Sequence, residues 1–320
     1  MQHHSLSDSP FSSSPLSGQP LSNPQPLSPE LEIIHQLSPL WAQRFTQLAC
    51  FIWEHLDQPL PVTELAERVE LSSYYFHRMF KAAFGEPVGS YIRRARLILA
   101  ADHLLETDRP VIDIALDCGF SSPQALAKAL KKQTGLTASE IRAARNQPGL
   151  TTITAIHAHL GQPTQSEQNP TQEQTIAARL SFVRHTCPDR HFHCVRVKQA
   201  TITDSYERWH AMASDSQQEM ISLTLGNPHT DTLNDLKVWV GYAVEPDSAN
   251  YMLTGGEFLS VRVSLTSTLG YYAAWEALIM YLVSEGLKPA HDTPALEITH
   301  NPHNFEGPVD ITLSVKLMPG

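Results

Sequence analysis

Basic and polar side chains recur in this 320-residue chain with a pattern that suits contact with a polyanion. Arg78 and Lys81 stand three residues apart, and Lys128 and Lys131 repeat that spacing 50 residues later. Residues three or four apart on a helix lie on one face. Arg can pair with guanine O6 and N7 in the DNA major groove, and Lys with phosphates. The spacing therefore favours two nucleic-acid-binding surfaces.

These surfaces belong to an internal repeat. Leu65-Ala66 and Leu71-Ser72-Ser73 match Ile114-Ala115 and Phe120-Ser121-Ser122, each 49 residues later. Further matches, each 50 residues later, join Phe76, Arg78, Phe80, Lys81 and Gly85 to Leu126, Lys128, Leu130, Lys131 and Gly135. Two similar helix-turn-helix units, joined by a helix over residues 89–106, explain the repeat.

Each unit is expected to present one recognition helix. In the first, a short helix near 63–69 packs across a longer one near 73–84 and buries Leu65, Ala66, Val69, Phe76, Met79 and Phe80. The candidate DNA contacts are Ser73, Tyr74, His77, Arg78 and Lys81, and in the second unit Gln124, Lys128, Lys131 and Lys132. Ser122 is a suitable N-cap with Pro123 at the first helical position. The alternative is a helical bundle with a solvated basic face, against which the second copy argues.

The elements that position these residues fall into four segments. Residues 1–37 are rich in Ser and Pro and are expected to form a disordered arm. Residues 38–146 show helical periodicity broken into roughly seven short helices, and 147–175 read as a polar linker. Residues 176–320 alternate like strands and contain two helical stretches, in the order strand, helix, strand, strand, repeated once. The expected fold is multidomain: an all-α double helix-turn-helix domain followed by a duplicated α+β domain.

The net charge of −10 is unevenly distributed. Residues 38–146 hold 13 Lys and Arg against 12 Asp and Glu, whereas 176–320 hold 10 against 16. A near-neutral domain can bind DNA when its basic groups share a face. Four widely separated cysteines make a poor disulfide framework, and no apolar run is long enough for a membrane span. We expect a cytoplasmic protein without a membrane partner.

The helical segment resembles the AraC/XylS family of bacterial regulators. The resemblance rests on Leu65-Ala66, Ser72-x-x-x-Phe76-x-Arg78-x-Phe80-Lys81, Gly85, Tyr91-Ile92-x-x-x-Arg96-Leu97, Asp113-Ile114-Ala115 and Gly119-Phe120. It implies a double helix-turn-helix domain that places two recognition helices in successive major grooves of an asymmetric promoter site. The second unit departs from the family pattern at Leu126, Lys128, Leu130 and Ala138-Ser139. Because Lys lacks the bidentate fork of Arg, we expect this unit to read DNA more permissively.

The C-terminal segment resembles gyrase-inhibitory-protein-like (GyrI-like) effector-binding domains. The parallel is clearest over Gly255-Gly256-Glu257-Phe258, the helix with Trp275 and Tyr281, Pro294-Ala295-Leu296-Glu297-Ile298 and Asp310-Ile311. The resemblance implies a cleft that binds bulky, often cationic or amphipathic molecules, with Glu297 as the ligand-facing acid. The strand pattern turns Leu296 and Ile298 to one face and Glu297 to the other. The candidate ligand-binding residues are Glu297, Trp239, Tyr242, Tyr272 and Trp275. The alternative makes Glu297 a surface acid and the aromatics core residues.

One further cluster has metal-binding residue types. His185, Cys187, His191, His193 and Cys194 lie within ten residues of chain. Structural zinc sites usually join two ligand pairs from separated segments, and a strand would turn Cys194 away from His191 and His193. We therefore expect no metal site and no cofactor.

These observations favour a DNA-binding transcription regulator controlled by a small effector. Double-stranded DNA and the effector are the expected partners, with RNA polymerase as a further one. A hydrolase with Glu297 as general base is one alternative. A ligand-free protein-interaction module is another. No nucleophile–base pair is evident in the sequence, so we expect no enzyme.

Overall fold

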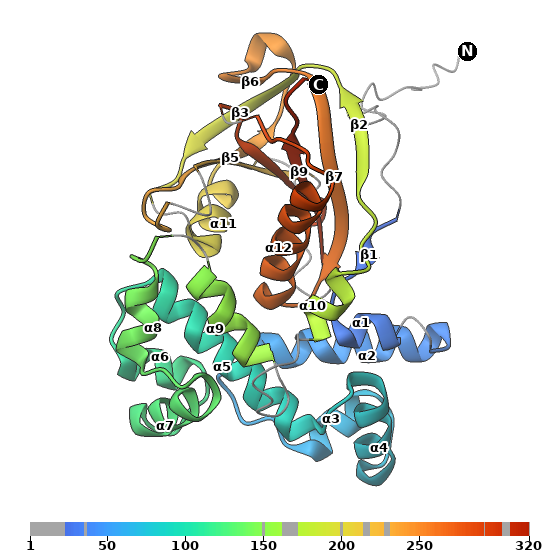
Figure 1. The fold of residues 1–320 in the computed structure, drawn as a ribbon. Coiled ribbons are helices and arrows are strands. Elements are labelled where there is room, and N and C mark those ends of the chain that lie inside the picture. Colours follow the sequence, from blue (N-terminus) through green and yellow to red (C-terminus); the bar gives the residue numbers. More distant parts are fainter. Residues whose placement is uncertain are drawn as a thin grey trace, which may run out of the picture.

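The computed structural model describes residues 23–34, 37–148, 151–161, 172–198, 201–213, 218–226, 231–290, 292–302 and 308–319. They form a helical body and a body built on one curved sheet (Figure 1). Within the described ranges, no helix has the length and apolar character needed to cross a bilayer. All four cysteines are buried, and none of them forms a disulfide.

Seven helices between residues 37 and 148, where every residue is described, confirm the predicted helical segment. They are α2 (Pro39–Glu54), α3 (Val62–Arg68), α4 (Ser73–Phe84), α5 (Val88–Glu106), α6 (Val111–Asp117), α7 (Pro123–Thr134) and α8 (Ala138–Ala144). The helix pairs α3–α4 and α6–α7 occupy the two halves of the repeat, and α5 joins them.

The ends of α4 and α7 show why the repeated residues recur. The Ser72 hydroxyl accepts a hydrogen bond from the Tyr75 amide at 3.4 Å, and Ser122 does the same for Ala125 at 3.2 Å. Both serines are therefore N-caps, as predicted for Ser122. Gly85 and Gly135 end the helices with φ of 73° and 74°, a conformation that favours glycine.

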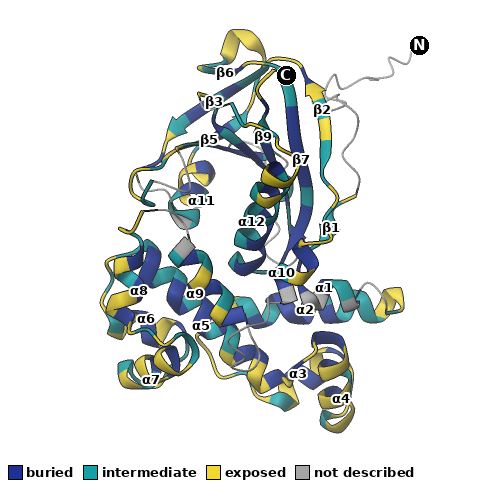
Figure 2. Cartoon of the chain, viewed as in Figure 1, coloured by how far each residue is buried: buried dark blue, intermediate teal, exposed yellow. Residues whose placement is uncertain are grey.

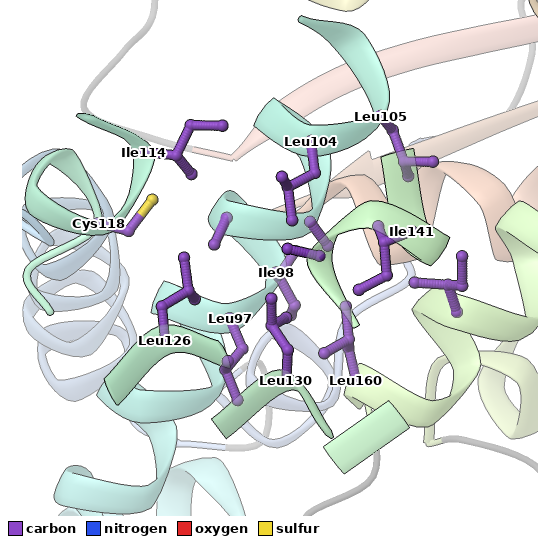
Figure 3. Packing of buried hydrophobic residues seen from close by; sticks show 14 of the residues in the cluster. Leu97, Ile98, Leu104, Leu105, Ile114, Cys118, Leu126, Leu130, Ile141 and Leu160 are labelled. Atoms are coloured by element: carbon purple, nitrogen blue, oxygen red, sulfur yellow. The ribbon is translucent and has the colours of Figure 1, made fainter. Parts of the chain in front are cut away.

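Two apolar clusters hold the helical body together, one for each unit. The first packs α2, α3 and α4 against the start of α5 around Phe45, Phe76 and Phe80. The second packs the end of α5 against α6, α7 and α8 around Leu105, Leu126 and Leu130 (Figure 3). Trp53 and Leu99 contact both clusters, so the units share one continuous interior.

The C-terminal body is rich in sheet. Its described strands are β2 (Val183–Cys187), β3 (Arg190–Arg196), β4 (Met220–Leu225), β5 (Lys237–Ala243), β6 (Tyr251–Leu253), β7 (Gly256–Leu265), β8 (Ala295–Thr299) and β9 (Val309–Lys316). With β1 (Gln25–Pro26), they follow the spatial order β1-β7-β9-β8-β4-β5-β3-β6, and β2 also pairs with β7. The helices are α11 (Ile202–His210) and α12 (Thr268–Ser284), with a short 3-10 turn η1 (Pro246–Ser248). The chain thus runs β3-α11-β4-β5 and then β7-α12-β8-β9.

Side-chain alternation places buried residues on both faces of the sheet, and much of β7 and β9 is coloured as buried in Figure 2. Leu296 and Ile298 of β8 join a cluster with Phe192 and Phe258 on one face. Across the opposite face, α12 covers the apolar residues of β7 and β9, including Val261 and Leu313.

The structure differs from the expected disordered arm over residues 23–34. Here β1 pairs in parallel with β7, and α1 (Pro29–Ile34) packs against α2 and α4. Leu27, Leu31 and Ile34 are buried, so three apolar residues at three- and four-residue spacing suffice to order this short segment. Residues 1–22 of the expected arm lie outside the described residues.

The expected linker also contains structure. α9 (Thr151–Gly161) buries Ile153, Ile156 and Leu160 in the second helical cluster, and α10 (Gln172–Ala177) packs against α12. The apolar spacing in α9 is helical, but a polar sequence composition around it favoured a linker. Between these helices, residues 162–171 lie outside the described part of the chain.

Candidate nucleic-acid interface

The first unit presents one face of α4 to solvent. Tyr74, His77, Arg78 and Lys81 are exposed and follow helical spacing, so they line one side of the helix. Phe76 and Phe80 point the other way, into the first cluster. The predicted contacts of this unit are therefore brought together, with Ser73 half-buried at the start of the helix.

The second unit presents an equivalent but more aliphatic helix. Gln124, Lys128 and Lys131 are exposed along α7, while Leu126 and Leu130 are buried. Lys132 is exposed beside Lys131. The Lys131 ammonium lies 3.7 Å from the Glu140 carboxylate of α8, an exposed pair that leaves the cation close to solvent.

Both recognition helices lie on the side of the helical body that faces away from the sheet (Figure 1). α5 separates them and contains 19 residues, which corresponds to a length of about 28 Å at 1.5 Å per residue.

Two further residues of this region differ in exposure. Tyr75 is 60% exposed beside Tyr74, as the helical spacing of the sequence predicts, and its ring meets that of Tyr74 edge-on at 5.9 Å. Arg96, by contrast, is used inside the protein, because its guanidinium donates to the Leu56 and Gln58 carbonyls at 2.9 and 2.7 Å. Its partial burial lowers its pKa. These contacts of Arg96 are tertiary and have no local signal in the sequence.

Comparison with known proteins gives the same assignment as this geometry. A family model described as a helix-turn-helix domain matches residues 65–144. The regulatory protein SoxS of Escherichia coli strain K12 is 40% identical over 95 residues, which cover 30% of this chain and 89% of SoxS. The chain belongs to the AraC-type helix-turn-helix regulators.

Other relatives match part of this AraC-type regulator. The transcriptional regulator Rob of Salmonella typhimurium is 43% identical over 83 residues, 26% of this chain and 29% of Rob. A solved AraC-type regulator from Chromobacterium violaceum is 29% identical, with a TM-score of 0.32, over 33% of this chain and 96% of that one. The DNA-binding domain of AdpA, solved with a target DNA, is 27% identical, with a TM-score of 0.29, over 37% and 94%.

A second candidate site in the AraC-type regulator surrounds Glu297. This side chain lies on the face of β8 opposite Leu296 and Ile298, as predicted, and is only 9% exposed. The Tyr271 hydroxyl of α12 donates a hydrogen bond to Glu297 Oε1 at 2.7 Å, and the Trp275 side chain also hydrogen-bonds the carboxylate. Burial raises the pKa of Glu297 to about 7, although both hydrogen bonds act to lower it.

The structure separates the aromatic residues predicted to surround Glu297. Trp275 lies at the carboxylate, and Tyr242 lies on the same sheet face with its ring 5.7 Å from that of His193. Trp239 packs in the cluster on the opposite face, because it is three residues from Tyr242 and strand side chains alternate. Tyr272 faces the helical body, where its ring centroid lies 4.4 Å from that of His157.

Sequence reasoning missed Tyr271, which is the closest partner of Glu297. Tyr271 and Trp275 are four residues apart on a helix, and this spacing could have paired them. Tyr271 is half-buried, and the desolvation of its hydroxyl beside the carboxylate raises its pKa well above its ordinary value.

The His and Cys cluster forms hydrogen bonds with its neighbours. Cys187 Sγ lies 3.2 Å from His185 Nδ1 and accepts a hydrogen bond from Arg190 at 2.8 Å. Cys194 packs in the apolar cluster that contains Leu296 and Ile298, and burial raises the pKa of its thiol to about 12. In the described ranges, no group of three or more His, Cys, Asp or Glu side chains is arranged to hold a metal ion.

Proposed function

We propose that this AraC-type regulator reads an asymmetric promoter site with α4 and α7 in successive major grooves. The observation that carries the proposal is the pair of exposed basic faces, at matching positions of two capped helices, on one side of the helical body. Arg78 would supply the main base contact, and Lys128, Lys131 and Lys132 would bind more permissively. RNA polymerase is the proposed partner of the DNA-bound regulator.

Selection of DNA fragments by the full chain tests this proposal. The wild type should enrich a discrete motif, and a double variant Arg78→Ala, Lys128→Ala should lose the enrichment at moderate salt. The matched control is Arg184→Ala, Lys288→Ala, which removes the same charges from the surface of the sheet body. If the Arg78→Ala, Lys128→Ala variant and the control variant enrich the motif equally, α4 and α7 are not the DNA-binding helices.

We further propose that residues 176–320 form a GyrI-like effector-binding domain, which binds an amphipathic cation at Glu297. The repeated strand, helix, strand, strand order and the buried carboxylate beside Tyr271 and Trp275 support this proposal. A buried carboxylate among aromatic rings suits a lipophilic cation, and the acidic surface favours its approach. A cation can reach the Glu297 carboxylate only if Tyr271 moves, because the Tyr271 hydroxyl is hydrogen-bonded to Oε1.

Titration with tetraphenylphosphonium, followed by calorimetry and Trp fluorescence, tests the effector site. Because the pKa of Glu297 is about 7, its negative charge develops between pH 6 and pH 8, and binding should strengthen over this range. Glu297→Gln should remove this pH dependence, whereas the exposed control Glu285→Gln should retain it. Absence of binding by the wild type would favour a ligand-free interaction module.

A second candidate function for the same site is hydrolysis of a reactive small molecule. The observation that favours it is the Glu297–Tyr271 pair, in which a carboxylate with a pKa near 7 could act as general base. Product analysis with reactive esters and epoxides separates this function from binding. Turnover that disappears in Glu297→Gln would support the hydrolase.

A further inference from the structure

The first two turns of α12 have two functional faces. Tyr271 and Trp275, four residues apart, point to Glu297. Thr268 and Tyr272, also four residues apart, point to the helical body. Successive residues on a helix are rotated by about 100°, so one short segment contacts both sites at once.

Asp102 of α5 is the point where three helices meet. Its Oδ2 accepts a hydrogen bond from the Thr268 hydroxyl of α12 at 2.8 Å. Its other oxygen, Oδ1, accepts one from His157 Nε2 of α9, also at 2.8 Å. His157 is fully buried, and its ring packs on Tyr272. One carboxylate oxygen therefore ties α5 to α12 of the sheet body, and the other ties α5 to α9.

The contacts continue from α9 to the second recognition helix. The Gln133 side chain of α7 donates to the His159 carbonyl of α9 at 3.0 Å. Ile153, Ile156 and Leu160 of α9 also pack in the same cluster as Leu126 and Leu130 of α7. A displacement of α9 must therefore disturb the packing that supports α7.

The helices lie close together at this contact. A space between α9, α10 and α12, bordered by His157, Tyr272 and Glu276, has a volume of only about 10 Å³, which is at the lower limit for a single water molecule. On the same stripe of α12, the Glu276 carboxylate accepts a hydrogen bond from Gln174 of α10 at 3.0 Å.

We propose that Thr268, Tyr272, His157 and Asp102 form a regulatory contact that couples the Glu297 site to the second DNA-reading unit. The proposal rests on the proposed effector site, because a ligand at Glu297 displaces the Tyr271 hydroxyl and moves the turn that bears Thr268 and Tyr272. α9 transmits this movement to α7, and Asp102 transmits it to α5. α4 packs near the start of α5, whereas Asp102 lies near its end, so the α4 surface is less affected than α7.

Hydrogen exchange of the full chain, without DNA or effector, tests the contact. Tyr271→Phe removes only the hydroxyl that binds Glu297. It should raise exchange in α9 and in residues 98–106 about fivefold, the lower range of allosteric coupling. The control Tyr281→Phe lies on the same helix, where its ring stacks on Phe182, and should leave these segments unchanged. Glu297→Gln perturbs the same hydrogen bond if Tyr271→Phe does not fold.

A second variant tests whether the movement passes through the Thr268–Asp102 hydrogen bond. Thr268→Val removes the hydroxyl that binds Asp102 and keeps the side-chain shape. In this background, Tyr271→Phe should no longer raise exchange in residues 98–106. An effect of Tyr271→Phe confined to α12 and β8 would overturn the proposal, and so would an undiminished effect in the Thr268→Val background. Because the experiment uses neither DNA nor effector, its result tests the regulatory contact independently of whether the proposed function is correct.

Discussion

At the turn that precedes the recognition helix, the first unit has Glu70 and the second has Gly119, 49 residues later. Both residues adopt left-handed backbone, with φ of 57° and 69°. The Glu70 side chain is exposed and pairs with Arg44 at 2.5 Å. A Cβ atom at Gly119 would lie only 2.3 Å from the Leu56 carbonyl oxygen. The same turn is thus open to solvent in one unit and packed against the segment between α2 and α3 in the other.

This difference shows that the units are not interchangeable copies. The first has an aromatic interior, in which the Phe80 and Phe84 rings stack at 4.0 Å. The second has an aliphatic interior and contributes to the junction with the sheet body through α9. We therefore expect the first unit to supply DNA specificity and the second to respond to the sheet body.

The largest effect is expected at the turn itself. Gly119→Ala should lower the free energy of unfolding by about 3 kcal/mol or more, because a left-handed non-glycine residue costs roughly 1–2 kcal/mol and the new methyl also displaces Arg96. Glu70→Gly should change it by less than about 1 kcal/mol, since relief of strain offsets an exposed ion pair. Urea denaturation measures both. Gly135→Ala, with open space around it, is the control, and equal losses at Gly119 and Gly135 would contradict the packing argument.

The next largest effect is expected on the affinity and specificity of DNA binding. Arg78→Ala should weaken binding to the selected site by about 1–3 kcal/mol and broaden the motif, because a bidentate base contact is lost. Lys128→Ala should reduce the binding free energy by a smaller amount and leave the selected motif largely unchanged. Fluorescence anisotropy with matched and mutated sites measures both. A greater loss of specificity from Lys128→Ala would reverse the assigned roles of the units.

A smaller effect is expected where the units differ after the recognition helix. Thr137 caps α8 in a reciprocal capping box with Glu140, whereas Pro87 at the matching position before α5 has no side-chain cap. Thr137→Ala should cost about 1 kcal/mol. Hydrogen bonds from Thr137 lower the pKa of Glu140, so its stabilisation is present at neutral pH and is lost as the pH falls through the folded-state pKa. Thermal unfolding at several pH values should show Thr137→Ala converging on the wild type in acid.

The smallest effect is on the salt dependence of binding. Lys132→Ala should weaken binding similarly across DNA sequences and reduce the slope of log affinity against log salt by about 1, as expected for one phosphate contact. Lys81→Ala in the first unit is the counterpart, and titrations at several salt concentrations compare the two. An unchanged slope for Lys132→Ala would remove it from the phosphate contacts.

The helical body was accessible to sequence reasoning because its determinants are local. Caps such as Ser122, the 50-residue repeat and the exposed face of α4 all follow from spacing within one or two turns. Seven helices were predicted, and seven are present between residues 37 and 148. The roles of the DNA-facing residues remain predictions.

The residues around Glu297 depended on contacts that spacing does not encode. Strand alternation placed Glu297 and Leu296 on opposite faces, but the register of β5 decided that Trp239 would lie away from Glu297. α9 was missed because its apolar residues find partners only in the second helical cluster. Tyr272 was assigned to the effector site because the junction with His157 could not be foreseen.

The pairing of β1 with β7 has a consequence for synthesis of the chain. Gln25 lies beside Val263, and the intervening stretch contains the entire DNA-reading region. At 5–20 residues per second, the ribosome needs about 10–50 seconds to make the partner strand after the first has emerged. The DNA-reading helices therefore have time to fold as an insert before the N-terminal strand can pair with β7. A fusion protein that carries the sheet body alone must therefore include the β1 segment, because truncation at a single point between the two bodies removes β1 from the sheet.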